Sequence, residues 1–140
     1  GLMRDFSLLD STVSNEETGV FQIITAGAAS GAPRLALRRE GGYVSIAVTS
    51  GPIEIALRPR FPELTRVLGR LRPISGPQTT RQVGTGQAYI ALGLRDDGAL
   101  VVRPTIVADA TGHLCFNLLV SPEARGALFA WLDVVPDEED

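Results

Sequence analysis

The chain has 140 residues with a net charge of −3, and 44% of them are hydrophobic; this length suits one domain that buries about two thirds of its unfolded surface. The single cysteine excludes an internal disulfide, and no apolar run approaches the roughly 18 residues that span a bilayer. No signal segment opens the chain, so we expect a soluble, cytoplasmic protein without a membrane partner.

Charge is distributed unevenly along the chain. Acidic residues are concentrated near both ends, whereas residues 19–132 hold twelve arginines against seven acidic residues, a net charge of +5. All 13 basic residues are arginines, which fits either bidentate contacts with phosphate or carboxylate groups or the codon bias of a GC-rich genome. The sequence therefore predicts a basic body with acidic ends.

The N-terminal residues 1–18 have no sustained hydrophobic period and many turn formers. We expect a flexible N-terminal tail there, docked at most through Phe6, Leu8 and Leu9. Residues 20–25 are apolar and β-branched, which predicts the first strand.

Three alternating stretches follow at residues 34–39, 43–49 and 53–58, joined by short turns that contain glycine. Turns this short require antiparallel neighbours, so a β-meander is predicted. From Pro62 the apolar period becomes that of an amphipathic helix of about eleven residues, which would lie across the sheet.

Residues 73–86 form a predicted linker rich in Gly, Pro and Thr, with a short strand expected near residues 81–83. Alternation between apolar and polar residues then resumes in three stretches, at residues 87–95, 100–108 and 113–120. These stretches predict a second β-meander.

The clearest helix start in the chain is the sequence Ser121-Pro122-Glu123. A hydroxyl caps the first turn, proline needs no hydrogen-bond donor there, and an acid is favoured at the positive end of the helix. We expect this helix to end near Asp133. Residues 134–140 would then leave the body as an acidic tail, either solvated or in contact with a protein partner.

The two halves of the chain share a pattern that indicates an internal duplication. LALRREGG at residues 35–42 matches LGLRDDGA at residues 92–99 with an offset of 57. The Pro-Glu pairs that begin the two helices, at Pro62 and Pro122, match with an offset of 60. A longer turn in the second copy accounts for the difference.

The predicted fold class is therefore α+β. It consists of two repeated antiparallel β-meanders, at residues 19–72 and 87–133, each closed by a C-terminal α-helix. The helices would pack on one face of the sheet and leave the other face open.

Few side chains are suited to catalysis. Cys115 and His113 lie on the same face of one predicted strand, about 6.5 Å apart, which is too far for them to share a proton. They also offer too few ligands for a metal, and Asp96 and Asp97 precede a glycine, as solvated hairpin residues do. The GTGQ sequence after Val83 lacks the lysine that a phosphate loop requires. We therefore expect no enzyme, no catalytic residue, no metal and no cofactor.

The open face of the predicted sheet is small, aromatic and basic. Aromatic rings there would stack on bases, arginines would neutralise phosphates, and small residues would permit close approach. Packing of the same face against another protomer is the alternative, in a protein-interaction or assembly module. The candidate nucleic-acid-binding residues are Arg34, Arg38, Tyr43, Arg58, Tyr89, Arg95 and Arg103, with Ser45, Ala47, Ala91 and Gly93 among them.

Each predicted helix follows a strand through a Pro-Glu junction, in IEIALRPRFPEL and in CFNLLVSPEA. Together with the repeated meander, these junctions resemble the fold shared by the Whirly proteins, the Pur-alpha family and the eukaryotic positive transcription coactivator that binds single strands. The resemblance covers residues 35–72 and 87–133.

The resemblance implies a module that binds single-stranded nucleic acid, with DNA expected before RNA, in transcription regulation or DNA maintenance. It also implies a homo-oligomer of two or more subunits and a binding surface on the strands opposite the helices. By position, Arg38, Tyr43, Tyr89 and Arg95 match the strand residues that would contact the nucleic acid.

Overall fold

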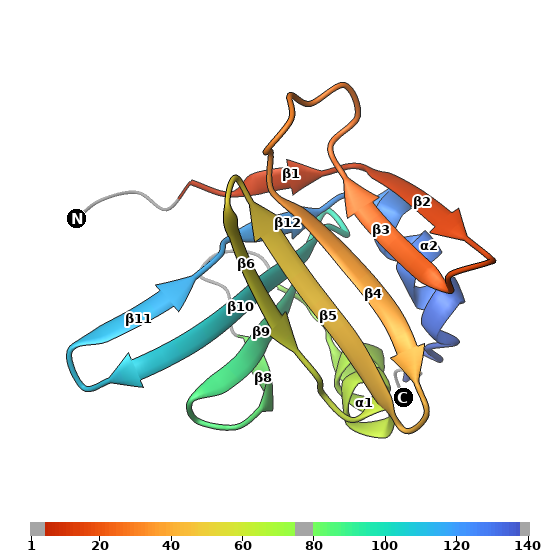
Figure 1. Ribbon diagram of the computed structural model, residues 1–140. Coiled ribbons are helices and arrows are strands. Elements are labelled where there is room, and N and C mark those ends of the chain that lie inside the picture. Colours follow the sequence, from red (N-terminus) through yellow and green to blue (C-terminus); the bar gives the residue numbers. More distant parts are fainter. Residues whose placement is uncertain (1–4, 75–79, 138–140) are drawn as a thin grey trace.

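The computed structural model describes residues 5–74 and 80–137, which form two β-sheets and two α-helices (Figure 1). The expected α+β class is confirmed. No helix in these two ranges is both long enough and apolar enough to cross a membrane.

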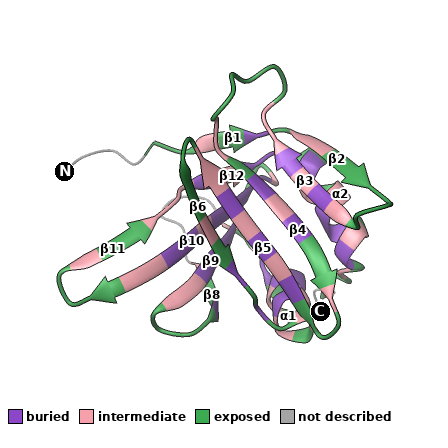
Figure 2. Cartoon of the chain, in the orientation of Figure 1, coloured by how far each residue is buried: buried purple, intermediate pink, exposed green. Residues whose placement is uncertain are grey.

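The first sheet has five strands in chain order, each antiparallel to the next. Buried and exposed residues alternate along the central strands because one face packs on the core (Figure 2). The α1 helix (Phe61–Arg70) follows directly and buries Leu64 and Leu68. The strands are β2 (Ser11–Asn15), β3 (Val20–Ile24), β4 (Arg34–Glu40), β5 (Tyr43–Ser50) and β6 (Ile53–Leu57).

The second sheet has seven strands and contains both parallel pairs found in residues 5–74 and 80–137, β1 with β12 and β7 with β9. The other pairs, β8 with β9, β9 with β10, and β10 with β11 and β12, are antiparallel. The α2 helix (Pro122–Leu132) follows β12 and is the last helix or strand of the described residues. The strands are β1 (Ser7–Leu9), β7 (Pro73–Ile74), β8 (Arg81–Gly84), β9 (Ala88–Arg95), β10 (Leu100–Asp109), β11 (Gly112–Cys115) and β12 (Leu118–Val120).

One hydrophobic core joins both sheets and both helices. The ring of Phe21 on β3 stacks on Trp131 of α2, with ring centroids 5.2 Å apart, and this contact ties the first sheet to the second helix. A cavity of about 30 Å³ at the centre is lined by Ile46, Leu64, Leu100 and Leu128 together with other apolar side chains from both sheets. The helices thus pack into a core between two sheets rather than on one common sheet.

The start of α2 has the predicted cap. Ser121 Oγ accepts a hydrogen bond from the Ala124 backbone nitrogen at 3.2 Å, and such caps contribute about 1 kcal/mol. At the other end Asp133 adopts a left-handed backbone conformation with φ of 61°, which stops the helix where the sequence predicts.

The expectation of a flexible tail over residues 1–18 needs correction, although residues 1–4 lie outside the described part of the chain. Residues 7–9 form β1, which pairs in parallel with β12, and residues 11–15 form β2 at the edge of the first sheet. Leu9 is fully buried. The N-terminal segment therefore enters both sheets, and short strands rich in Ser and Thr gave no periodic signal.

The acidic C-terminal segment also differs from the prediction. The Asp137 backbone nitrogen donates to the Gly69 carbonyl at 2.8 Å, and the Asp137 carboxylate lies 3.7 Å from Nε of Arg70. Residues 134–137 therefore lie against α1 instead of leaving the body, while residues 138–140 are outside the described ranges.

The last predicted strand, residues 113–120, is interrupted. It divides into β11 and β12 at Phe116 and Asn117, and within the described residues β11 pairs with the outer half of β10 alone. The alternation within residues 113–120 would place Leu114 on the same apolar face as Leu118 and Val120, but Leu114 is exposed, on the hairpin of β10 and β11 that projects from the body (Figure 1). The predicted linker at residues 73–86 contains β7 and the expected short strand β8, with residues 75–79 outside the described ranges.

Gly84 at the end of β8 should tolerate no side chain. Its φ is +122°, and a Cβ atom would lie 2.5 Å from the Ala88 carbonyl oxygen. We expect Gly84→Ala to lower the free energy of unfolding by about 2 kcal/mol, because strained backbone conformations cost roughly 1 to 3 kcal/mol. Gly86→Ala is the control, since nothing lies within 4 Å of its Cβ position. Urea unfolding of both variants measures the difference, and equal stabilities would contradict the strained turn.

Candidate nucleic-acid interface

The outer face of the five-stranded sheet carries four of the predicted binding residues. We call the exposed side of β4, β5 and β6 the basic face, because its side chains alternate with the buried ones of the same strands (Figure 2). The strand register brings these side chains into rows across the sheet. The basic face consists of Arg34, Ala36, Arg38, Glu40, Tyr43, Ser45, Ala47, Thr49, Glu54, Ala56, Arg58 and Arg60.

The middle row of the basic face is made of alanines. Ala36 pairs with Ala47, and Ala47 pairs with Ala56, so three methyl groups cross three neighbouring strands. Because alanine side chains are short, a planar group such as a nucleic-acid base can approach the backbone of the sheet closely along this row. One neighbouring row contains Arg34, whose Nε donates to Thr49 Oγ1 at 3.1 Å.

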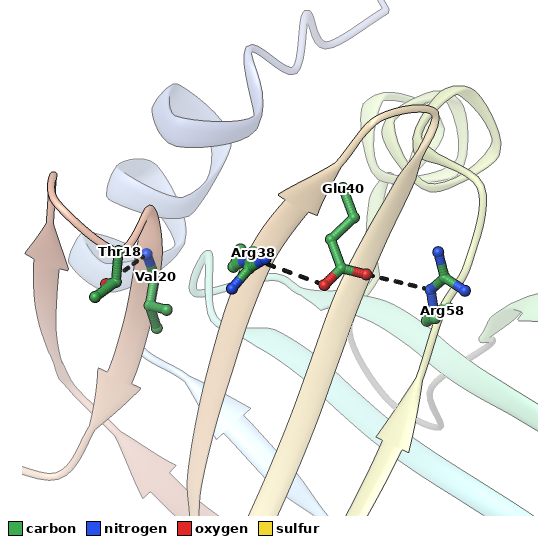
Figure 3. Close-up of polar contacts among 5 residues, drawn as sticks. All are labelled: Thr18, Val20, Arg38, Glu40 and Arg58. Carbon is green, nitrogen blue, oxygen red and sulfur yellow. Dashed lines mark hydrogen bonds and ion pairs between the residues drawn. The ribbon is translucent and has the colours of Figure 1, made fainter.

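Two arginines of the basic face share one carboxylate (Figure 3). Glu40 lies between them, with oxygens 3.8 Å from Nε of Arg38 and 3.3 Å from Nε of Arg58. The two arginine side chains are 56% and 61% exposed, so these ion pairs contribute little to stability and are screened by salt. The group of Arg38, Arg58 and Glu40 carries one excess positive charge.

Tyr43 lies beside the same group. Its ring is exposed, and the guanidinium carbons of Arg58 and Arg60 lie 5.0 and 5.8 Å from its centroid. Sequence reasoning missed Arg60 because it stands next to the first helix. The signal in the sequence is Arg-Pro-Arg at residues 58–60, which continues the alternation of β6. In the structure Pro59 is buried between two exposed arginines, and the pairing with β5 continues through a bridge between Tyr43 and Arg60.

The other three predicted residues, Tyr89, Arg95 and Arg103, lie on the second sheet. Their strands are buried on both faces at the centre, where Ala91 and Thr105 are inaccessible. The expected continuous face therefore does not form; the structure separates the seven residues into groups of four and three.

The two arginines of the second group have partners. Arg95 contacts the Asp97 carboxylate at 2.9 Å. Arg103 is half-buried, and its Nε donates to Asn117 Oδ1 at 2.9 Å. Both are thus less available to a large ligand than Arg38 and Arg58.

Tyr89 connects the two groups. A hollow of about 190 Å³ is lined by Arg58 and Pro59 from the end of the first sheet and by Tyr89 and Gly84 from the second. On its other side Tyr89 borders a hollow of about 490 Å³, which it shares with Arg103 and residues of the projecting β10–β11 hairpin. A chain of ligand groups could pass from the basic face to Arg103 by way of Tyr89.

Cys115 and His113 also line the larger hollow. The sulfur of Cys115 lies 3.4 Å from Thr105 Oγ1 and 3.7 Å from a terminal nitrogen of Arg103. Nearby, hydrogen bonds from the side chain and backbone of Thr111 hold the pKa of the Asp109 carboxyl below its ordinary value. Among the described residues, no three His, Cys, Asp or Glu side chains are grouped as a metal site would require.

Comparisons of the chain with protein-family models, with curated proteins and with solved structures found no match.

Proposed function

We propose that the protein is a non-enzymatic module that binds single-stranded nucleic acid on the basic face, with DNA as the first ligand to test and RNA as the second. The observation that carries the proposal is the exposed Tyr43 ring between Arg58 and Arg60, on the same face as Arg38 and the row of alanines. An aromatic platform flanked by cations offers stacking and phosphate contacts together. The alanine floor lets the strand lie close.

A single strand suits this arrangement better than a duplex. The bases of a single strand are free to stack on tyrosine, whereas a duplex keeps its bases paired and stacked. The hollow between Arg58 and Tyr89 gives the strand a second aromatic side chain to reach. Arg103 in the next hollow then offers a further phosphate contact.

The order of elements supports the resemblance to the Whirly and Pur-alpha group. β3, β4, β5, β6 and α1 correspond in order to β8, β9, β10, β12 and α2, and the strands within each series pair in the same antiparallel order; the second series has β11 inserted between β10 and β12. This correspondence is what an internal duplication would leave. It favours a role in transcription regulation or DNA maintenance for the protein.

Fluorescence anisotropy of a labelled mixed-sequence strand of about 30 nucleotides tests the proposal, because single-strand sites span roughly 4 to 16 nucleotides per small domain. DNA, RNA and duplex DNA are titrated at two salt concentrations. Saturable binding that prefers the single strand and weakens with salt is the expected result. Absence of binding at low salt, or a preference for duplex, would overturn the proposal.

Tyr43→Ala should weaken binding about tenfold, since stacking of a base on an aromatic side chain contributes roughly 1 to 3 kcal/mol. Tyr43→Phe keeps the ring and should bind within about twofold of the wild type, because the phenolic hydroxyl is not needed for stacking. The same anisotropy titration measures both variants. A loss in the Phe variant as large as in the Ala variant would exclude stacking as the cause.

An assembly module that uses the basic face is the second candidate, and the flat alanine row favours it. Small side chains allow two sheet faces to pack closely. Sedimentation velocity of the protein with and without a saturating single strand separates the candidates. Self-association of a protein that binds no single-stranded nucleic acid would favour assembly. Self-association that decreases when single-stranded nucleic acid binds would indicate that both use the basic face.

A further inference from the structure

The strand β6 ends the five-stranded sheet and leaves one edge open. The pairing order places β5 on one side of β6, and no strand of the described residues lies on the other. Its side chains alternate, with Glu54 and Ala56 on the basic face and Ile53, Ile55 and Leu57 on the core side. Ile53 is nevertheless 47% exposed, because it is the first residue of β6, next to the turn at residues 51–52. An open edge with exposed apolar residues is a template for pairing with a β-strand of another chain.

The backbone groups at this edge can be assigned from the pairing of β6 with β5. The Val44 nitrogen donates to the Pro59 carbonyl at 3.0 Å. Leu57 and Ile55 lie two and four residues before Pro59 in the same register, so their backbone groups also point toward β5. In an antiparallel pair, alternate residues exchange hydrogen bonds with the neighbour. The N–H and C=O groups of Glu54, Ala56 and Arg58 therefore point away from β5, toward the open edge.

We propose that β6 pairs antiparallel with β6 of a second copy of this chain, about a two-fold axis at Ala56. In this register the outward-pointing backbone groups of the two strands meet, as a ladder requires. On the basic face, Glu54 of each copy lies opposite Arg58 of the other. On the core side, Ile55 lies opposite Leu57, and the exposed Ile53 lies opposite Pro59.

The charges favour this register over those shifted toward the start of β6. An axis at Glu54 would place two carboxylates opposite each other, and an axis at Ile55 would place Glu54 opposite Ala56. An axis at Leu57 would also place Glu54 opposite an arginine, Arg60, but would leave Arg58 opposite Ala56, so reversal of both charges at Glu54 and Arg58 separates the two registers. Cross-strand pairs of opposite charge stabilise a sheet, whereas like charges destabilise it. Glu54 has no ion-pair partner within the described residues, and Arg58 has only the carboxylate that it shares with Arg38.

The dimer would join two basic faces into one surface on a ten-stranded sheet, with the Arg58 side chains at the seam. The dimer proposal is independent of the proposed nucleic-acid binding, and the dimer is measured on the protein alone. If the dimer forms and no nucleic acid binds, the edge proposal stands and the proposed function is wrong. If nucleic acid binds and no dimer forms, only the edge proposal is wrong.

Sedimentation equilibrium of the full chain tests the pairing with charge reversals. Glu54→Arg and Arg58→Glu should each raise the dimer dissociation constant at least tenfold, because each places like charges opposite each other twice. The double variant with both reversals should return the dissociation constant to within about threefold of the wild type. The proposal would be overturned if the wild-type protein were monomeric at about 100 μM. It would also be overturned if the dimer of the double variant had a dissociation constant no lower than those of the single variants.

Ala56→Pro tests the backbone ladder without altering charge. Proline removes only the N–H that points to the open edge, and edge strands tolerate it at such positions. The variant should be monomeric while circular dichroism and the thermal midpoint show a folded protein. A folded variant that still dimerises as the wild type does would show that β6 is not the contact.

Discussion

Replacing Arg38 and Arg58 with alanine is expected to weaken single-strand binding about 25-fold at 0.1 M salt. Each phosphate contact on a single strand contributes a slope of about 0.7 in the plot of log affinity against log salt. Two lost contacts therefore lower the slope by about 1.4, which corresponds to about 25-fold at 0.1 M. Glu40 would lose both of its arginine partners and repel the strand, so the loss should be no smaller than this.

The control for this variant is Arg66→Ala with Arg70→Ala on α1, which changes the net charge by the same amount. Both side chains are exposed on the helix and away from the basic face, and the ion pair lost, between Arg70 and Asp137, is itself exposed, so the main change is in the long-range field of the protein. Anisotropy titrations at four salt concentrations should give a slope near that of the wild type. If the two double variants lose affinity equally, binding follows net charge and not the basic face.

Glu40→Gln supplies a test of opposite sign. It removes the carboxylate that competes with phosphate for Arg38 and Arg58, and binding should tighten several-fold at low salt. A weaker complex would show that Glu40 positions the arginines instead of competing for them.

The parts of the fold that the sequence predicted are those fixed by short-range rules. The β4, β5 and β6 strands lie within a residue or two of the predicted bounds because alternation and glycine turns specify them locally. The start of α2 was predicted because Ser121 caps it within its own turn. The four candidate binding residues of the first sheet share one face for the same reason: Arg34, Arg38, Tyr43 and Arg58 lie on strands joined by tight turns.

The parts that could not be predicted depend on contacts between distant segments. β1 pairs with β12, more than 100 residues further along the chain, and a three-residue strand has no period to detect. Tyr89 and Ala91 alternate with buried residues as Tyr43 and Ala47 do, but alternation does not report that both faces of β9 are enclosed at its centre. Local patterns thus placed each side chain on its strand but did not show that the two meanders form separate sheets.

The N-terminal strand gives the largest expected loss of stability. Leu9 is 0% exposed, and its carbonyl accepts a hydrogen bond from the Ser121 nitrogen at 3.0 Å, next to the start of α2. We expect Leu9→Ala to lower the free energy of unfolding by about 3 kcal/mol, because buried Leu→Ala changes cost roughly 2 to 5 kcal/mol through lost transfer energy and a residual cavity. For a chain of this length the thermal midpoint should fall by about 10 °C.

Leu8→Ala is the matched control one residue away. Leu8 is 47% exposed and on the opposite side of the strand, so its truncation should change stability by less than about 0.5 kcal/mol. Urea unfolding followed by circular dichroism compares the two variants on the same backbone. Equal and small losses would mean that residues 7–9 behave as the tail that the sequence pattern indicates. A loss confined to Leu9 requires that β1 is part of the cooperative core, because only a strand held in register with β12 gives adjacent leucines such different environments.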